Sequence, residues 1–426
     1  MKQKVLGLYE KLKEGILSTL SANVINKAIG LLSSMVITRL LSTADYGIWS
    51  YVLNIYSYLT LVTGFGLVSG ALQFGAENKG EGKAYSFYNY CTRTGILIDF
   101  ILVTAFSTVI AFVQLPIEGA KPFVLGMLPV LLAEYVNSIG QSILRAQNRI
   151  NEYANVLNVN TILIAIGTCG GALFGLWGVV IGRYLAYFFS AVYLVRLLRQ
   201  DLRLIHKADT LNESDKKQLW HYSIFTGASS AMNCVVYYID ITLIAALIKT
   251  ASDIAVYRVG TLIPNALEFI PNSVIVAILP TIIYNREDLN WVRKNVKRVY
   301  CGLGMLNIAI VGVIFVASPL IICIISGERY MSSVPILRTL AAGYFFSGTF
   351  RNLSVNLLAA FRRVHFGLFI AGLTCFLDIG LNYALIKCYG MIGAAYATFF
   401  VAVITAIISF TYVIYLLRRG TIYEAH

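Results

Sequence analysis

The amino-acid sequence predicts an all-α integral membrane protein of about twelve transmembrane helices, arranged as two six-helix lobes around a central cavity. The chain has 426 residues, of which 58% are hydrophobic and only 13% are charged, and its mean hydropathy is +0.72. Soluble proteins carry roughly 25% charged residues, so about half of the usual charge is missing. Residues 153–182 and 389–417 contain no Asp, Glu, Lys or Arg. Each stretch exceeds the roughly 20 apolar residues that span a bilayer, which excludes soluble strands.

The apolar segments follow one another closely, and each predicts one transmembrane helix. Before the first of them, the sequence MKQKVLGLYEKLKEG has no small-residue cleavage site after it. It therefore predicts a cytoplasmic amphipathic lead-in and not a removable signal peptide. The predicted spans are residues 16–40, 47–73, 91–115, 122–144, 153–175, 176–198, 222–248, 254–284, 299–325, 334–358, 366–388 and 390–417.

The distribution of charge predicts the orientation of the chain and its division into lobes. The net charge is +13, and with a cytoplasmic N-terminus most of the 34 basic residues fall in cytoplasmic loops. This is the usual bias of membrane proteins, so both termini are predicted inside and no nucleic-acid surface is needed. The longest connection is polar and carries both charge signs. We expect an N-terminal lobe at 1–198, a cytoplasmic linker at 199–221, a C-terminal lobe at 222–417 and a cytoplasmic tail at 418–426.

The second half of the chain repeats the first weakly and in the same order. Six spans per half is an even number, so the halves share one orientation, as in transporters that bind their substrate between two repeated halves. The matching segments are STADYGIW (42–49) with TASDIAVY (250–257), LRAQNRINEY (144–153) with LAAFRRVHFG (358–367), and GLWGVVIG (175–182) with GMIGAAYA (390–397).

Polar and charged residues inside the predicted spans indicate the lining of a cavity. A charge at the bilayer centre costs about 2.5–3.5 kcal/mol, and Lys27, Glu134 and Asp378 fall nearest the midplane. Asn23, Lys27 and Ser34 share one face of the first span, and the seventh span carries a similar stripe. The alternative is that these stripes are helix contacts, since small polar residues pack membrane bundles. The residues of the seventh-span stripe that we assign to the cavity are Asn233 and Asp240.

The eighth span contains prolines on both sides of an acidic residue. Pro264 and Pro271 flank Glu268, and each proline removes a helix hydrogen bond. The pattern predicts a bent helix beside the cavity that acts as a gate, or else a static kink. In the second half, Arg351 and Asp378 could pair between neighbouring spans, and a structural role and a functional one fit them equally well.

No motif for catalysis or metal binding is present in the sequence. There is no GxSxG, HExxH, Walker A or dinucleotide fingerprint, and the seven cysteines and four histidines are scattered. We expect no enzyme activity, no cofactor and no metal site. Transport would then depend on gradients or on the membrane potential, with Na⁺ or H⁺ as the candidate coupling ions.

The first two spans resemble those of a known superfamily. The segment NKAIGLLSSMVITRLLSTADYGIWSYV (26–52) is similar to the opening of the multidrug/oligosaccharidyl-lipid/polysaccharide (MOP) exporters. The length and the twelve-span layout are most similar to the polysaccharide-type branch, the flippases for O-antigen or capsule repeat units. The residues that carry the resemblance are Lys27, Gly30, Arg39, Tyr46 and Gly47.

The resemblance implies a bacterial inner-membrane flippase that turns undecaprenyl-pyrophosphate-linked oligosaccharides from the cytoplasmic to the outer leaflet by alternating access. A cavity with Lys27, Arg39, Arg258 and Arg351 would hold the pyrophosphate. The lipid tail would leave by a lateral opening beside the first and eighth spans. Implied partners are the lipid-linked oligosaccharide, membrane lipids and polysaccharide assembly proteins.

Two other functions in the same superfamily remain open. A multidrug cation antiporter would use an acidic cavity. A flippase for lipid-linked peptidoglycan precursors would carry more basic residues where Ser33 and Ser34 stand. The acidic residues available to an antiporter are Glu134, Asp240, Glu268 and Asp378.

Overall fold

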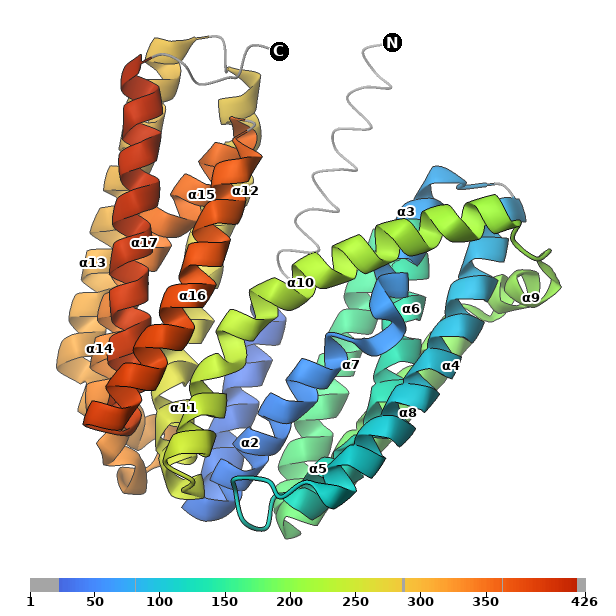
Figure 1. Ribbon diagram of the computed structural model, residues 1–426, viewed down its shortest axis with the longest axis horizontal. Coiled ribbons are helices and arrows are strands. Elements are labelled where there is room, and N and C mark those ends of the chain that lie inside the picture. Colours follow the sequence, from blue (N-terminus) through green and yellow to red (C-terminus); the bar gives the residue numbers. More distant parts are fainter. Residues whose placement is uncertain (1–22, 81, 286–287, 362, 420–426) are drawn as a thin grey trace. The chain divides into compact units, whose positions relative to one another are not determined.

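The computed structural model describes residues 23–80, 82–285, 288–361 and 363–419, with the side chains of 229–236 and 364 outside the description. Residues 23–40 are helical and precede the labelled helices of Figure 1. The later elements are α2 (Thr43–Thr60), the 3₁₀ turn η1 (Thr63–Gly66), α3 (Leu67–Glu77), α4 (Gly82–Phe112), α5 (Lys121–Met127), α6 (Val130–Ala146), α7 (Ile150–Ala172), α8 (Gly175–Leu197), α9 (Arg199–Lys207), α10 (Glu213–Leu247), α11 (Ala251–Leu267), α12 (Phe269–Tyr284), α13 (Leu289–Ser326), the 3₁₀ turn η2 (Glu328–Ser333), α14 (Val334–Phe346), the π-helical turn η3 (Ser347–Arg351), α15 (Asn352–Ala360), α16 (Val364–Tyr389) and α17 (Met391–Arg419).

The predicted fold class, an all-α integral membrane protein, is confirmed. Within the described residues, eight helical segments are long and apolar enough to cross a membrane, or nine when the bent pair α2 and α3 counts as one span. The three other predicted spans also have helical counterparts. These are the helix at 23–40, α10, and α14 continued through η3 into α15.

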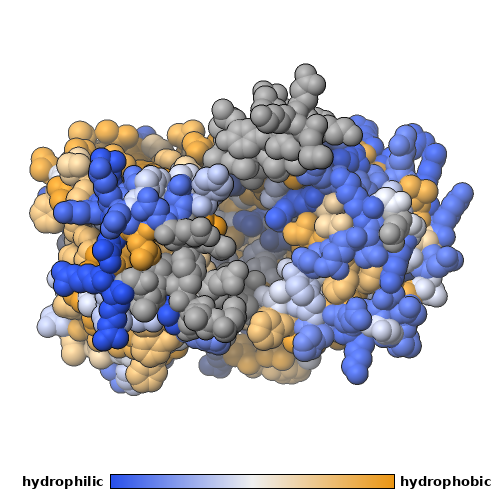
Figure 2. Space-filling model, turned by 90° about the horizontal axis from the view of Figure 1, so that it is seen from above, coloured by the Kyte–Doolittle hydropathy of each residue, from blue (hydrophilic) through white to orange (hydrophobic). Residues whose placement is uncertain are grey.

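The chain divides into two compact units, Met1–Tyr238 and Ile239–His426, and the division falls inside α10. The lobe and linker boundaries expected from the sequence stay predictions. Figure 2 looks onto the helix ends that lie at the top of Figure 1, and hydrophilic residues gather at these ends in both units.

In the first unit, α7 and α8 form a closely packed hairpin. A Cβ on Gly167 would lie 2.2 Å from the Gly182 carbonyl oxygen, and one on Gly171 would lie 2.0 Å from that of Gly178. Each helix thus carries two glycines, four residues apart, on the side that faces the other helix. Small residues at these positions allow the two membrane helices to approach closely. The uncharged stretch 153–182 therefore covers most of α7, a tight turn and the beginning of α8.

The second predicted span is broken near its middle. α2 and α3 bend by 42° across Gly64, Phe65 and Gly66, whose φ angles of 59°, 44° and 80° are left-handed. The fully buried carboxylate of Asp99 accepts a 2.7 Å hydrogen bond from the Gly64 amide. At the break, the Gly64 amide has no helix carbonyl to donate to, and the Asp99 carboxylate takes the place of that carbonyl. Backbone groups inside a bilayer need such a partner within the protein. The ring of Tyr135 occupies the space where a Gly64 side chain would lie.

The eighth predicted span is divided into α11 and α12 at Glu268, and the two together form one segment long and apolar enough to cross a membrane. Its bend and its role as a gate stay predictions. A proline removes the hydrogen bond to the carbonyl four residues before it, and for Pro271 this is the carbonyl of Leu267. The Tyr344 hydroxyl lies 3.2 Å from the Leu267 oxygen and can donate to it. The freed carbonyl is therefore satisfied inside the second unit.

Hydrogen bonds and ion pairs connect α9 to the turn between α6 and α7. Arg149 donates hydrogen bonds to Glu152 at 2.8 Å and to Asp201 at 2.8 Å, and Gln147 donates to the other oxygen of Asp201 at 2.7 Å. The hydrogen bond with Glu152, together with the nearby carboxylates, raises the pKa of Arg149. Arg149 therefore remains the cation at the centre of this network.

We expect Arg149→Ala to lower the free energy of unfolding by about 1 kcal/mol, because the ion pairs are partly exposed and screened by solvent. Thermal unfolding in detergent at low and high salt would measure the loss, which salt should reduce. Lys79→Ala, at an exposed site of the same unit, should change the stability little. Equal effects of the two substitutions would contradict a structural role for the network.

Candidate functional site

The polar stripe of the first helix lies on an open face of the first unit. Asn23 and Lys27 are exposed, and a Cβ on Gly30 would meet no atom within 4 Å. Ser34 donates a 2.9 Å hydrogen bond to the Gly30 carbonyl of its own helix. Among the described residues of this unit, the structure gives the Lys27 ammonium no hydrogen bond, ion pair or aromatic contact. A cation in this setting can receive an anionic ligand.

A neighbouring face of the same helix packs within the unit. Ser33 Oγ lies 3.3 Å from the Sγ of Cys169 on α7. Arg39, near the end of the helix, is exposed and lies three turns beyond Lys27. The packed and open faces of this helix are therefore distinct.

The first unit contains a polar centre built from three membrane helices. Tyr56 of α2 donates a short hydrogen bond to Glu134 of α6. Arg183 of α8 lies over the ring of Tyr56, with its guanidinium carbon 5.4 Å from the ring centroid. Tyr187 forms hydrogen bonds with both Glu134 and Arg183. An acid and a base thus share two tyrosines inside the bundle.

The sequence predicted Glu134 as a site residue, indicated Arg183 as a charge near one end of a span, and gave no indication of the two tyrosines. The sequence feature that pointed to this centre was Arg183, because it is the charged residue that ends the uncharged stretch 153–182. Neither tyrosine could have been selected from the 27 in the chain, since only packing places them beside the carboxylate.

The second unit contains a different polar centre, which surrounds Asp240 on α10. The carboxylate accepts hydrogen bonds from Tyr257, from Asn382 at 2.9 Å and from Thr398 at 3.1 Å. The Asn382 amide also donates to Asp378 Oδ1 at 3.1 Å. Asp378 and Asn382 are buried, and Asp240 is half-buried. Two carboxylates from different helices therefore share one amide donor.

This second centre has the composition of a site for a proton or a hard monovalent cation. Its groups are oxygen donors, and carboxylate, amide and hydroxyl oxygens suit hard cations. The Asn382 side-chain oxygen is buried without a hydrogen-bond partner among the described residues. In the part of the chain that the structure describes, no cluster of three or more His, Cys, Asp or Glu residues could hold a metal ion.

The remaining predicted site residues are spread over the second unit. Arg351 ends the π-helical turn η3, is half-buried and acts electrostatically on Asp378. Arg258 is half-buried on α11. Glu268, at the division between α11 and α12, acts electrostatically on Tyr344. The side chain of Asn233 lies outside the described residues.

The two centres occupy corresponding places in the internal repeat. The segments GLWGVVIG (175–182) and GMIGAAYA (390–397) are each followed by a residue of one of the centres, Arg183 in the first unit and Thr398 in the second. At this position of the repeat, the first unit has the guanidinium of Arg183, and the second unit has the hydroxyl of Thr398 beside two carboxylates.

Comparisons with known proteins agree with this architecture. The chain matches the structure "Lipid II flippase MurJ, inward closed conformation" with a TM-score of 0.76 and 17% identity, over 94% of this chain and 87% of that one. It matches an inward-facing multidrug resistance MATE family transporter of the MOP superfamily with a TM-score of 0.73 and 13% identity, over 93% and 96% of the two chains. A MOP superfamily transporter from Pyrococcus furiosus gives a TM-score of 0.57 at 14% identity, over 95% and 96%. These likenesses establish the fold.

The family follows from the sequence itself. No curated protein sequence matches the chain significantly. A family model described as polysaccharide biosynthesis protein matches residues 12–286, more than half of the chain. The resemblance to the MOP superfamily is thereby confirmed, and the solved structures with this fold are named as transporters and a flippase, not as enzymes. The chain belongs to the polysaccharide biosynthesis protein family, with the fold of the MOP superfamily.

Proposed function

We propose that the protein is a flippase that moves undecaprenyl-pyrophosphate-linked oligosaccharide repeat units from the cytoplasmic to the outer leaflet of a bacterial inner membrane. The observation that carries the proposal is Lys27, an exposed cation on a membrane helix beside the open position at Gly30. A buried or lipid-facing charge is costly, so a cation at this depth needs an anionic ligand or water. Membership of the polysaccharide biosynthesis protein family supports a carbohydrate cargo.

The pyrophosphate supplies the anion that this cation would bind. Lys27 is the proposed principal contact, and Arg39, Arg258 and Arg351 remain further candidates from the sequence. With both termini cytoplasmic and the cell interior negative, each negative charge moved outward gains about 2.3 kcal/mol per 100 mV. The membrane potential would therefore favour export of the lipid-linked sugar.

The centre around Asp240 and Asp378 is the proposed coupling site. Binding of Na⁺ or H⁺ there would neutralise part of the negative charge of two neighbouring carboxylates, which repel each other at short distance. The division between α11 and α12, with Pro264 and Pro271 on either side of Glu268, is the proposed gate for the lipid tail. Alternating access would then follow from movement of the two repeated halves around the central site.

We expect Lys27→Ala to slow flipping of a fluorescent undecaprenyl-pyrophosphate oligosaccharide at least tenfold. Loss of a hydrogen bond to a charged group costs roughly 1.5–3 kcal/mol, and 1.4 kcal/mol corresponds to a factor of ten. The assay uses purified protein in liposomes, with an enzyme or quencher that reaches only the outer leaflet.

The matched control is Lys83→Ala, which removes an exposed lysine paired with Asp215 at 2.9 Å. This control should flip the substrate at the unaltered rate. Equal flipping by the Lys27 variant would refute the cationic site.

Drug efflux from whole cells that Glu134→Gln abolishes would support the multidrug antiporter instead. Flipping of lipid-linked peptidoglycan precursor in preference to the oligosaccharide would support the other alternative.

A further inference from the structure

A long groove runs along the second unit between α13 and α17, with α14 and the turn η3 beneath it. Its volume is about 700 Å³. Two of its lining residues, Met305 and Ile308, are 69% and 60% exposed on a helix apolar enough to span a membrane. The groove therefore opens toward the hydrocarbon of the bilayer. We call it the α13/α17 groove; it is lined by Arg293, Val296, Lys297, Tyr300, Cys301, Gly304, Met305, Ile308, Phe345, Phe350, Phe410, Ile414, Leu417 and Arg418.

The floor of the α13/α17 groove is a rigid aromatic surface. The rings of Tyr300, Phe350 and Phe410 form mutual contacts, and the Tyr300 and Phe410 centroids are 5.0 Å apart. The Tyr300 hydroxyl is fixed by a 2.8 Å hydrogen bond with Ser354. At Gly304 the wall has no side chain, and an added Cβ would come no closer than 3.6 Å to the Thr349 methyl. The floor is therefore a continuous aromatic surface with an open position at Gly304.

One end of the α13/α17 groove is basic. Arg293 donates to the carbonyls of Leu417 and Arg418 at 2.5 Å and 3.1 Å, so it joins the start of α13 to the end of α17. Lys297 and Arg418 line the same end and are exposed. No acidic residue lines the groove, and among the described residues neither of these two side chains has an ion-pair partner. The exposed positive charge at this end is therefore uncompensated within the described part of the chain.

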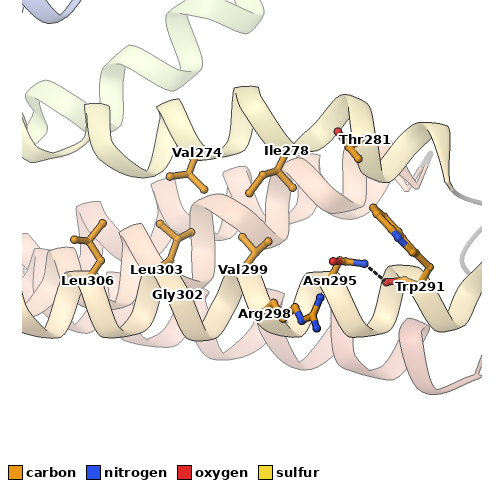
Figure 3. Close-up of a pocket in the computed structure, with 10 residues that line it drawn as sticks. All are labelled: Val274, Ile278, Thr281, Trp291, Asn295, Arg298, Val299, Gly302, Leu303 and Leu306. Carbon is orange, nitrogen blue, oxygen red and sulfur yellow. Dashed lines mark hydrogen bonds between the residues drawn. The ribbon is translucent and has the colours of Figure 1, made fainter.

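A second groove on the other side of α13 provides a comparison. It lies between α12 and α13, has a volume of about 440 Å³ and contains one cation, Arg298. Figure 3 shows Asn295 beside it, whose amide donates to the Trp291 carbonyl at 2.8 Å. The α13/α17 groove combines the larger volume with three cations, which makes it the better site for an anionic lipid.

We propose that the α13/α17 groove binds an anionic phospholipid of the bilayer. One acyl chain lies along the aromatic floor past Gly304, and the phosphate lies between Lys297 and Arg418. Basic pockets between membrane helices select acidic headgroups, whereas a zwitterionic headgroup brings its own positive charge. This site is separate from the proposed transport residues and does not depend on the cargo.

Native mass spectrometry of the purified full-length protein tests the proposal, with phosphatidylglycerol and phosphatidylcholine of identical acyl chains as probes. We expect phosphatidylglycerol to be retained at least tenfold more tightly. Lys297→Gln combined with Arg418→Gln should remove this preference, and Gly304→Leu should lower the binding of both lipids by filling the groove. A thermal unfolding curve for each variant verifies that it is folded.

Two matched control substitutions lie on α13. Lys294→Gln removes an exposed cation that lines neither groove, and Gly312→Leu adds a side chain where a Cβ would meet nothing within 4 Å. Both should bind phosphatidylglycerol like the unaltered protein. Equal binding of the two lipids, or equal losses in the control and test variants, would overturn the proposal. Preferential binding of undecaprenyl phosphate through the same residues would assign the groove to the carrier lipid and also overturn it.

Discussion

Replacing Arg183 with methionine is expected to lower the free energy of unfolding of the first unit by roughly 1.5–3 kcal/mol. The loss of hydrogen bonds that involve a charged group costs this much, and Arg183 and Glu134 are both half-buried. Here the remaining charge is Glu134, which Tyr56 and Tyr187 hold in place through hydrogen bonds. Methionine keeps the unbranched apolar stem of arginine and removes the guanidinium with its charge and its hydrogen-bond donors.

Adding Glu134→Gln to Arg183→Met should restore a large part of the lost stability, since no unpaired charge then remains. Reversible unfolding in mixed detergent micelles would measure both variants as a double-mutant cycle. Arg196→Met, at the exposed end of the same helix, should have a small effect. Losses from Arg183→Met and Glu134→Gln that simply add would show that the two charges do not interact.

Replacing Asp240 with asparagine is expected to abolish the response of flipping to an imposed Na⁺ or H⁺ gradient and to slow flipping at least tenfold. The substitution removes one of two carboxylates that share the Asn382 amide. Tyr257 and Thr398 donate to one oxygen of Asp240 and Asn382 donates to the other, so an asparagine amide could accept hydrogen bonds on only one of these two sides. Asp378 then remains as a single carboxylate, and the pair of carboxylates that the coupling ion would bind is lost.

The measurement compares initial flipping rates in liposomes with and without each gradient. Asp209→Asn, in the exposed connection before α10, should retain both the rate and the response. If the Asp240 variant responds to the gradient as strongly as the unaltered protein, the coupling site lies elsewhere. A response that is lost with Na⁺ but kept with H⁺, or the reverse, would identify the coupling ion.

The helices and their membrane character could be predicted because they depend on local composition. A helix that satisfies its own backbone hydrogen bonds is the ordinary solution for an apolar stretch in a bilayer, so the uncharged residues 153–182 and 389–417 specify spans without tertiary information. The division of the eighth span could also be predicted, since Pro271 must free the Leu267 carbonyl wherever the helix packs. The break at Gly64 was missed, because the glycines alone do not show that Asp99 supplies the replacement acceptor.

The candidate site was predictable only in part, for a related reason. A charge such as Lys27, Glu134 or Asp378 stands out inside an apolar span, so the sequence identifies it without a structure. Its partners do not stand out, because tyrosine, asparagine and threonine are common in membrane helices. Tyr56 lies 78 residues from Glu134, and Thr398 lies 158 residues from Asp240. Such pairs form only when separate helices pack.

The sequence by itself determined that this chain is a helical membrane protein with repeated halves and charged residues at depth, because the cost of burying charge acts on each segment separately. The tertiary structure decided what those charges contact. It placed Arg183 against Glu134 in one unit and Asp240 beside Asp378 and Asn382 in the other. It also formed the basic end of the α13/α17 groove from the beginning of one helix and the end of another. Side-chain partners are set by packing between distant segments, and no local pattern in the chain encodes that packing.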